Sequence, residues 1–395
     1  MEKLRFGIGI SMNGEVVIIN TFDLGAVINL AKLKKILLEA TKKDLEKKRA
    51  APKYAAIPSV EYLQMPSVKL DTNIGTIDFS VNARFFSQGA VTITMRTDFS
   101  VDRLSSLMKY YNLQIKSIDK EGKEGEGKEG AKNILDYALR ITNDFRVKIK
   151  DALEEPYSVE VEPRQYYVFS IYDSKKKPRE FVEEDTREIA GLLRNEPHFS
   201  ELSEEEIKDA LKERHSYFSN DLAIIDWNAA LIMEPKGEYE DTLLIIELAN
   251  MQVVEMAAYN AYFDKVLQKA YDDIEFAFSQ TGKSRERARE MVRELREARL
   301  DLIELTTDLF NAIMLFGDWY LAKLHRACLD KFDLEEYREV VIYKLDTLEK
   351  LFQIVKAEIE QEASDKEAKR GNMLEAIIVV LIVIEVLLFV WEIIK

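Results

Sequence analysis

The C-terminal stretch NMLEAIIVVLIVIEVLLFVWEIIK, residues 372–395, restricts the fold of this chain more than any other segment. As a helix, residues 376–394 would be about 28 Å long at about 1.5 Å per residue, which matches the hydrocarbon core of a bilayer. The central Glu385 costs about 3 kcal/mol on insertion, whereas each Leu, Ile, Val or Phe favours insertion by about 0.3–0.6 kcal/mol. The apolar residues outweigh the glutamate, so the sequence predicts a transmembrane helix.

Basic residues predict the orientation of this helix. Lys366, Lys369 and Arg370 precede the apolar run, and only Lys395 follows it. The positive-inside rule then keeps the bulk of the chain in the cytoplasm, with a single-pass tail anchor in the cytoplasmic (inner) membrane. The N-terminus carries early acidic residues and no long apolar run, so we expect neither a signal peptide nor a mitochondrial presequence.

The carboxylates inside the predicted membrane helix need an explanation. Glu385 and Glu392 are seven residues apart, nearly two helical turns, so they share one face. Because intramembrane carboxylates rarely face lipid, we hypothesise that neighbouring helices associate through a protonated, hydrogen-bonded Glu385. The alternative is that an otherwise sufficient anchor tolerates one polar residue.

The rest of the chain predicts an α+β protein in which an N-terminal α/β portion is followed by long helices and the membrane helix. The high charged fraction, 32%, suits long solvent-exposed helices better than a compact enzyme. The expected segments are an N-terminal α/β region (1–120), a flexible Gly/Glu/Lys loop (121–130), a second part of the α/β region (131–235), a long-helix coiled-coil region (236–371) and the tail anchor (372–395).

Local signals mark turns and caps in the α/β region, which we expect to form one or two domains. Asn13-Gly14 lies between two β-prone runs and predicts a hairpin, and Gln88-Gly89 predicts a turn between two strands. Ser203 followed by Glu206 predicts a capping box at a helix start. Residues 217–234 predict two adjacent strands that turn near Asp226.

Two apolar seams in the helical region alternate steps of four and three, which is typical of a coiled coil. They leave open whether antiparallel hairpins or contacts between subunits bury them, or both. The first seam comprises Met291, Leu295, Ala298, Leu302, Leu305, Leu309, Ala312 and Phe316, and the second comprises Val341, Leu345, Leu348, Phe352, Val355 and Ile359.

Charge limits the partners. The net charge of −15 argues against general DNA binding. One arginine-rich stretch is a candidate contact for RNA or anionic lipid head groups, or else a solvated helix face with i,i+4 ion pairs. Its candidate residues are Arg285, Arg289, Arg293 and Arg296. The single cysteine fits a reducing compartment.

We nominate no catalytic residue, cofactor or metal. His325 and Cys328 lie three residues apart on a predicted helix, but a metal would need two more ligands, and unrelated packing is the alternative. Asp226 is expected to build a structural corner. Glu247, Asn250 and Glu255 are expected on an exposed helix face or in a polar cluster between subunits.

Several stretches together resemble the family named "required for meiotic nuclear division". They are ARFFSQGAVTITM (83–95), PHFSELSEEEI (197–207), YFSNDLAIIDWNAALI (217–232), LLIIELANMQVVEMAAYNAYFDKVL (243–267) and LEAIIVVLIVIEV (374–386). The resemblance implies an α/β N-terminal region, a helical C-terminal region and one membrane span. Eukaryotic members of that family are mitochondrial membrane proteins tied to organellar translation, and none is an established enzyme. Without a presequence, this chain is expected to be a prokaryotic member.

The order of elements also resembles the plan of CorA-type magnesium channels. Those channels have two spans and a Gly-Met-Asn sequence after the first, whereas Gly371-Asn372-Met373 differs in order and precedes the span. We therefore expect a non-enzymatic, homo-oligomeric membrane scaffold that presents its α/β surface to a cytoplasmic protein or ribonucleoprotein. A CorA-like channel or transport regulator is the alternative.

Overall fold

A computed structural model of the chain describes residues 12–40, 60–118, 131–154, 160–235, 238–279, 293 and 319–394. The chain divides into two compact units. Unit 1 comprises residues 1–262 and 304–341, and unit 2 comprises residues 263–303 and 342–395. The N-terminal sheet followed by helices is the predicted α+β class.

Unit 1 is built on a nine-stranded sheet with the order β6-β3-β4-β5-β1-β8-β11-β10-β9. All neighbours are antiparallel except β11 and β8, which are parallel. Both predicted α/β segments therefore supply strands to one sheet. The strands are β1 (Met12–Asp23), β3 (Val60–Thr72), β4 (Gly75–Phe86), β5 (Ala90–Val101), β6 (Ile115–Ile118), β8 (Arg164–Asp173), β9 (Glu213–His215), β10 (Leu222–Ile225) and β11 (Ala229–Met233). A two-stranded sheet pairs β2 (Val27–Ile28) with β7 (Leu153–Glu154).

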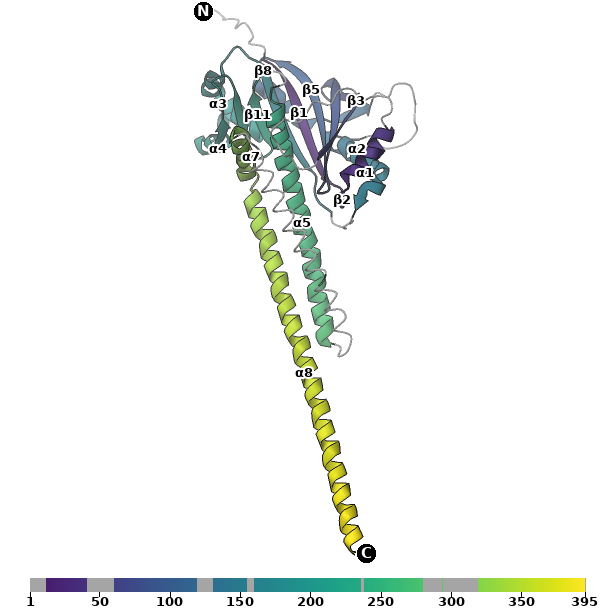
Figure 1. The fold of residues 1–395 in the computed structure, drawn as a ribbon. Coiled ribbons are helices and arrows are strands. Elements are labelled where there is room, and N and C mark those ends of the chain that lie inside the picture. The colour runs from purple at the N-terminus through teal and green to yellow at the C-terminus, as the bar shows by residue number, and fades with distance from the viewer. Residues whose placement is uncertain are drawn as a thin grey trace, which may run out of the picture. The chain divides into compact units, whose positions relative to one another are not determined.

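Helices cover both faces of the large sheet (Figure 1). On one side lie α1 (Leu30–Ala40), α2 (Ile134–Lys148), α3 (Pro178–Arg194) and the 3-10 helix η1 (Leu104–Asn112), and α4 (Glu204–Ala210) packs on α3. On the other side lie the first part of α5 (Glu240–Ser279) and α7 (Trp319–Lys331). The central strand β1 sends Val16 into the first core and Val17 into the second, because side chains alternate along a strand. This explains the unbroken apolar run Val16–Ile19 in the middle of the strand.

Two of the predicted turn and cap signals are confirmed and one is wrong. Gly89 has φ 126° in the turn between β4 and β5, and the Ser203 side chain accepts a hydrogen bond from Glu206 N at the start of α4. Asn13-Gly14 forms no hairpin because it lies inside β1. A Cβ on Gly14 would lie 2.1 Å from the Ser170 carbonyl oxygen, so this glycine permits close strand packing instead of a turn.

Among the described residues, one helical segment, Glu240–Asp272, is long and apolar enough to cross a membrane. Its most apolar window is 89% buried inside the protein. Up to Tyr262 this segment belongs to unit 1, where Leu243, Ile246 and Met251 pack on the sheet. The apolar character of α5 is therefore accounted for by core packing.

Unit 2 contains the later part of α5 and most of α8 (Leu334–Ile394). The two helices are tied by an ion pair in which Lys344 Nζ lies 2.5 Å from Asp264 Oδ1. Because they run in the same direction (Figure 1), they do not form an antiparallel hairpin with each other. In the second seam Leu348 is buried, and the side chains of Phe352, Val355 and Ile359 lie outside the described residues. The members of the first seam also lie outside the described residues. The coiled coil stays a prediction.

Candidate functional site: buried polar groups of unit 1

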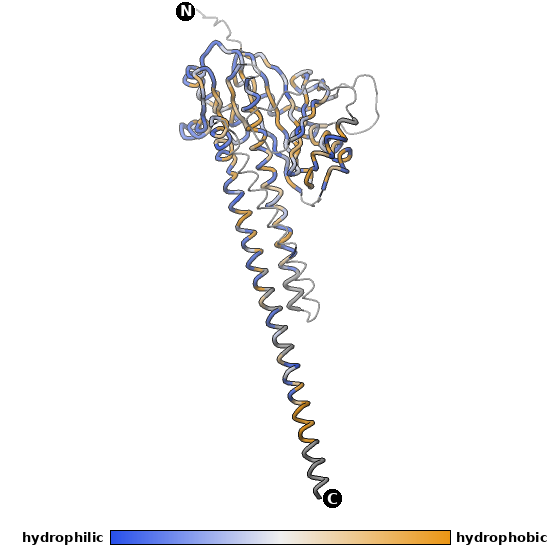
Figure 2. Tube along the Cα trace, viewed as in Figure 1, coloured by the Kyte–Doolittle hydropathy of each residue, from blue (hydrophilic) through white to orange (hydrophobic). Residues whose placement is uncertain are grey.

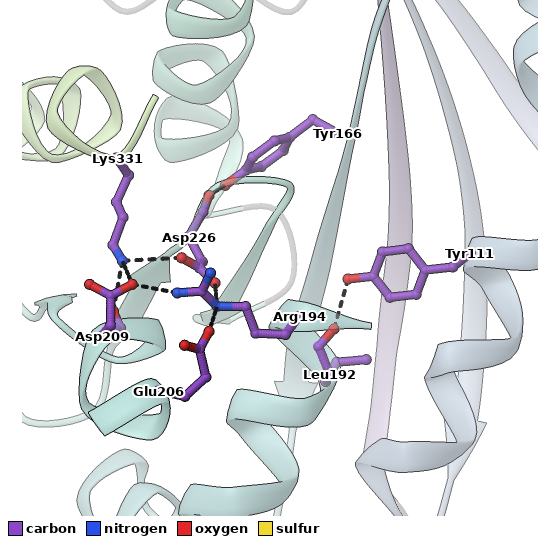
Figure 3. Close-up of polar contacts among 8 residues, drawn as sticks. All are labelled: Tyr111, Tyr166, Leu192, Arg194, Glu206, Asp209, Asp226 and Lys331. Carbon is purple, nitrogen blue, oxygen red and sulfur yellow. Dashed lines mark hydrogen bonds and ion pairs between the residues drawn. The ribbon is translucent and has the colours of Figure 1, made fainter. Parts of the chain in front are cut away.

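A cluster of charged side chains gathers where α3, α4, α7 and the β10–β11 turn meet (Figure 3). We call it the Asp226 cluster, and its members are Arg194, Glu206, Asp209, Asp226 and Lys331. Asp226 is 1% exposed, so its carboxylate sits in the protein interior. A buried charge requires compensating partners, which here come from segments far apart in the sequence.

Two cations hold the Asp226 carboxylate. Arg194 Nε lies 2.8 Å from Oδ2, and Lys331 Nζ lies 3.2 Å from Oδ1. Both cations also reach Asp209, since Arg194 is ion-paired with it and Lys331 Nζ donates to its carbonyl oxygen at 2.7 Å. Arg194 further lies 3.3 Å from Glu206. The charges of the cluster therefore largely neutralise one another.

The pKa values of Asp226 and Asp209 are shifted in opposite directions, by burial and by ion pairing respectively. Burial raises the pKa of Asp226, and the opposing effects of Arg194 and Lys331 do not cancel it. The hydrogen bond from Lys331 instead lowers the pKa of Asp209, whose side chain is 54% exposed. Asp226, the buried member of the cluster, therefore depends on Arg194 and Lys331 to stabilise its ionised form.

The Asp226 cluster fastens α7 to the sheet. The Tyr166 hydroxyl of β8 donates to the Asp226 carbonyl oxygen at 2.9 Å, and this hydrogen bond ties the β10–β11 turn to β8. Lys331 is the last residue of α7, and α8 begins at Leu334 after Asp333, whose φ is 51°. The start of α8 is therefore positioned by buried ion pairs to the sheet.

Polar residues of α5 form a second buried group. Glu247 accepts a hydrogen bond from Thr94 Oγ1 at 2.7 Å and lies 3.0 Å from Arg84 Nε. Asn250 accepts from Arg164 Nε at 2.6 Å. The expectation of an exposed face is wrong, since both residues are at most 2% exposed and take partners from β4, β5 and β8.

Glu255 is fully buried on the same helix, and neither of its carboxylate oxygens has a hydrogen-bond partner in the described structure. Burial raises its pKa to about 8, and the charge of Asp23 adds to that shift. At neutral pH the folded protein therefore holds Glu255 largely as the neutral acid.

His325 and Cys328 are both buried in α7. His325 Nε2 lies 2.9 Å from Gln252 Oε1, and burial lowers the His325 pKa to about 4. Burial raises the pKa of the Cys328 thiol, which disfavours a thiolate. Within the described part of the chain, no three His, Cys, Asp or Glu residues are grouped to hold a metal. These two residues serve as packing for α7.

The other predicted site residues are only partly described. Glu385 and Glu392 lie in α8, but their side chains are outside the described residues. Of the four arginines, Arg293 is helical and exposed, and the description does not extend to Arg285, Arg289 and Arg296. Their proposed contacts stay predictions.

The partners of Asp226 could not be found from the sequence. Arg194 reads as the last residue of an amphipathic helix, and Lys331 lies more than a hundred residues farther along the chain. The only available signal was Asp226 itself, an acid placed between two strongly apolar strands.

Comparison with known proteins identifies similar sequences. Residues 13–240 match the family described as "Uncharacterized protein MJ0711, N-terminal domain". Uncharacterized protein MJ0711 of Methanocaldococcus jannaschii is 26% identical over 292 residues, which cover 69% of this chain and 84% of that protein. No solved structure matches.

Proposed function

This chain belongs to the MJ0711 N-terminal domain family, and from its own residues we propose that it is a membrane-anchored scaffold without catalytic activity. The last part of α8 crosses the cytoplasmic membrane once, and the chain assembles as a homo-oligomer. Unit 1 presents a cytoplasmic surface to a partner.

The observation that carries this proposal is the exposure of an apolar helix. Eight consecutive residues, Ile377–Ile384, are apolar, and each is between 47% and 59% exposed. Figure 2 draws this part of α8 as a continuous hydrophobic band. Since a helix that is apolar on all sides requires an apolar environment, lipid is the fitting solvent. Removing these eight side chains from water would be worth on the order of 10 kcal/mol.

The buried ion pairs of unit 1 support a structural role for its polar residues. Its buried carboxylates Asp226 and Glu247 are held by cations of neighbouring elements and fix the positions of α5 and α7. Their contacts stabilise the fold and the junction with α8. This arrangement suits a rigid platform joined to an anchor.

Two lysines in the apolar stretch test the anchor. We expect Leu381→Lys with Ile384→Lys to move the full-length chain from the membrane fraction to the aqueous fraction. Each replacement changes the insertion free energy by about 3 kcal/mol, so together they remove the predicted margin. The measurement is fractionation of cells with an alkaline carbonate wash, followed by immunodetection.

The control carries two lysines on exposed positions of the same helix at the same spacing, Gln361→Lys with Ser364→Lys. This variant should remain in the membrane fraction. If the wild-type chain itself is recovered in the aqueous fraction without detergent, the membrane anchor is wrong and the scaffold proposal fails with it.

A second substitution tests the assembly. We expect Glu385→Leu to lower the oligomer size in mild detergent, because it removes the hydrogen-bonding carboxyl from the membrane helix. Light scattering after size-exclusion chromatography measures the mass, and Glu375→Leu serves as the control near the end of the helix. An unchanged mass for Glu385→Leu rules out this contact. Divalent-ion uptake by liposomes that depended on Glu385 would instead favour the CorA-like alternative.

A further inference from the structure

Two aromatic side chains project from the loop between β9 and β10. Tyr217 is 60% exposed and Phe218 is 64% exposed, and their rings meet edge to face with centroids 4.7 Å apart. The Asp221 carboxylate accepts hydrogen bonds from both backbone N–H groups, at 2.7 and 2.8 Å. The loop backbone therefore holds both rings in place before any partner arrives.

The first turn of α7 continues this aromatic surface within unit 1. The Tyr217 ring lies 5.4 Å from the ring of Tyr320, which is mostly buried. The neighbouring Trp319 is 74% exposed, and Lys323 Nζ lies 5.5 Å from the centre of its ring. Single exposed aromatics are common on protein surfaces, but here two exposed rings contact each other, and one of them contacts the residue that follows the exposed Trp319.

Two cations of α7 lie on the same face of that helix as Trp319. Lys323 and Arg326 follow Trp319 by four and seven residues, so all three lie on one face of α7, and all are exposed. In the described structure neither cation has an acidic partner, whereas Arg194 and Lys331 are ion-paired. We call Tyr217, Phe218, Trp319, Lys323 and Arg326 the aromatic–basic patch.

We infer that the aromatic–basic patch binds a short acidic peptide segment of a partner protein. Apolar side chains of the peptide cover the rings, and its carboxylates face Lys323 and Arg326. Aromatic residues and arginine dominate binding hot spots, and rings already held in place lose little entropy on binding. The inference extends the proposed scaffold function by naming the class of partner.

Size and charge favour a peptide over other partners. Three partly exposed aromatics offer a few hundred Å² in all, well below the roughly 800 Å² that each partner buries in a stable interface between folded domains. The chain carries a net charge of −15, which repels a long polyanion such as RNA, whereas a segment with a few acids is affected much less.

Peptide selection with the full-length chain in detergent tests the inference, and it does not depend on membrane insertion. A random displayed library is selected against the wild-type chain and against the triple variant Trp319→Ala, Lys323→Glu, Arg326→Glu. We expect the wild type to enrich peptides that combine Asp or Glu with apolar residues. The best synthetic peptide should bind the variant about tenfold more weakly or worse, and its binding should weaken with salt.

A matched control changes the same charge and removes one exposed aromatic elsewhere, by Lys69→Glu, Lys116→Glu and Tyr343→Ala. This control variant should enrich the same peptides as the wild type. The inference is overturned if no peptide is enriched, if the triple variant selects the same peptides, or if basic peptides win. If the wild type retains poly-uridine and the triple variant does not, the patch binds nucleic acid instead. If the triple variant has a lower oligomer mass than the wild type, the patch serves self-association.

Discussion

Asp226→Ala is expected to lower the free energy of unfolding of unit 1 by about 3 kcal/mol, because it leaves two cations without their buried carboxylate. The loss stays at the lower end of the usual range, since Arg194 and Lys331 both retain Asp209. A change of this size should lower the thermal midpoint by about 6 °C. Tryptophan fluorescence during heating measures it, and Trp227, adjacent to Asp226, reports the local change.

Asp209→Ala provides the matched control for this substitution. It removes a carboxylate from the same cluster, but one whose side chain is 54% exposed, so the expected loss is below about 1 kcal/mol. Equal effects of the two substitutions would contradict the central position of Asp226. A midpoint for Asp226→Ala within experimental error of the wild type would show that the Asp226 cluster does not fasten α7.

Glu255→Gln is expected to remove a steep pH dependence of stability. The folded protein holds Glu255 with a pKa of about 8, whereas an unfolded glutamate titrates near 4.5. Between these values the folded state binds the extra proton, so the stability of the wild type falls as pH rises from about 4.5 to about 8. Glutamine cannot ionise, and the variant should therefore gain on the order of 3–5 kcal/mol relative to the wild type across this window.

The measurement is denaturant unfolding of wild type and variant at a series of pH values, and the quantity compared is the difference between the two curves. The difference cancels other titrating groups, such as Glu234, whose pKa burial raises to about 7. Glu205→Gln, at an exposed position, is the control and should give a flat difference. A flat difference for Glu255→Gln as well would mean that this carboxyl is not held neutral.

The strands and helices of the α/β region follow local rules and were largely predictable. The β10–β11 pair lies within residues 217–234, where the sequence predicts two adjacent strands, and the β4–β5 turn lies at the predicted Gln88-Gly89. Asn13-Gly14 was misread because the same residue pair that suits a tight turn also suits a crowded strand. Only the neighbouring β8 and Phe99, which leave no room for a Cβ, decide between the two.

The buried polar residues could not be predicted for a different reason. Glu247, Asn250 and Glu255 are charged or polar residues on a helix, and a sequence pattern assigns such residues to solvent. Glu247 and Asn250 are paired in the interior with Arg84, Thr94 and Arg164, which lie on strands up to 163 residues earlier in the chain. The aromatic–basic patch was missed similarly, since Tyr217 meets Tyr320, the residue after Trp319, only when α7 packs beside the loop.

The sequence alone determined the α+β class, the strands on either side of Asp226 and the apolar character of the C-terminal segment, because these depend on composition and on patterns within a few residues. The tertiary structure decided which strands share one sheet, which acids are buried and which exposed rings lie together. Those features depend on pairs of residues far apart in the chain, and burial reverses the behaviour that an ionisable side chain has in water.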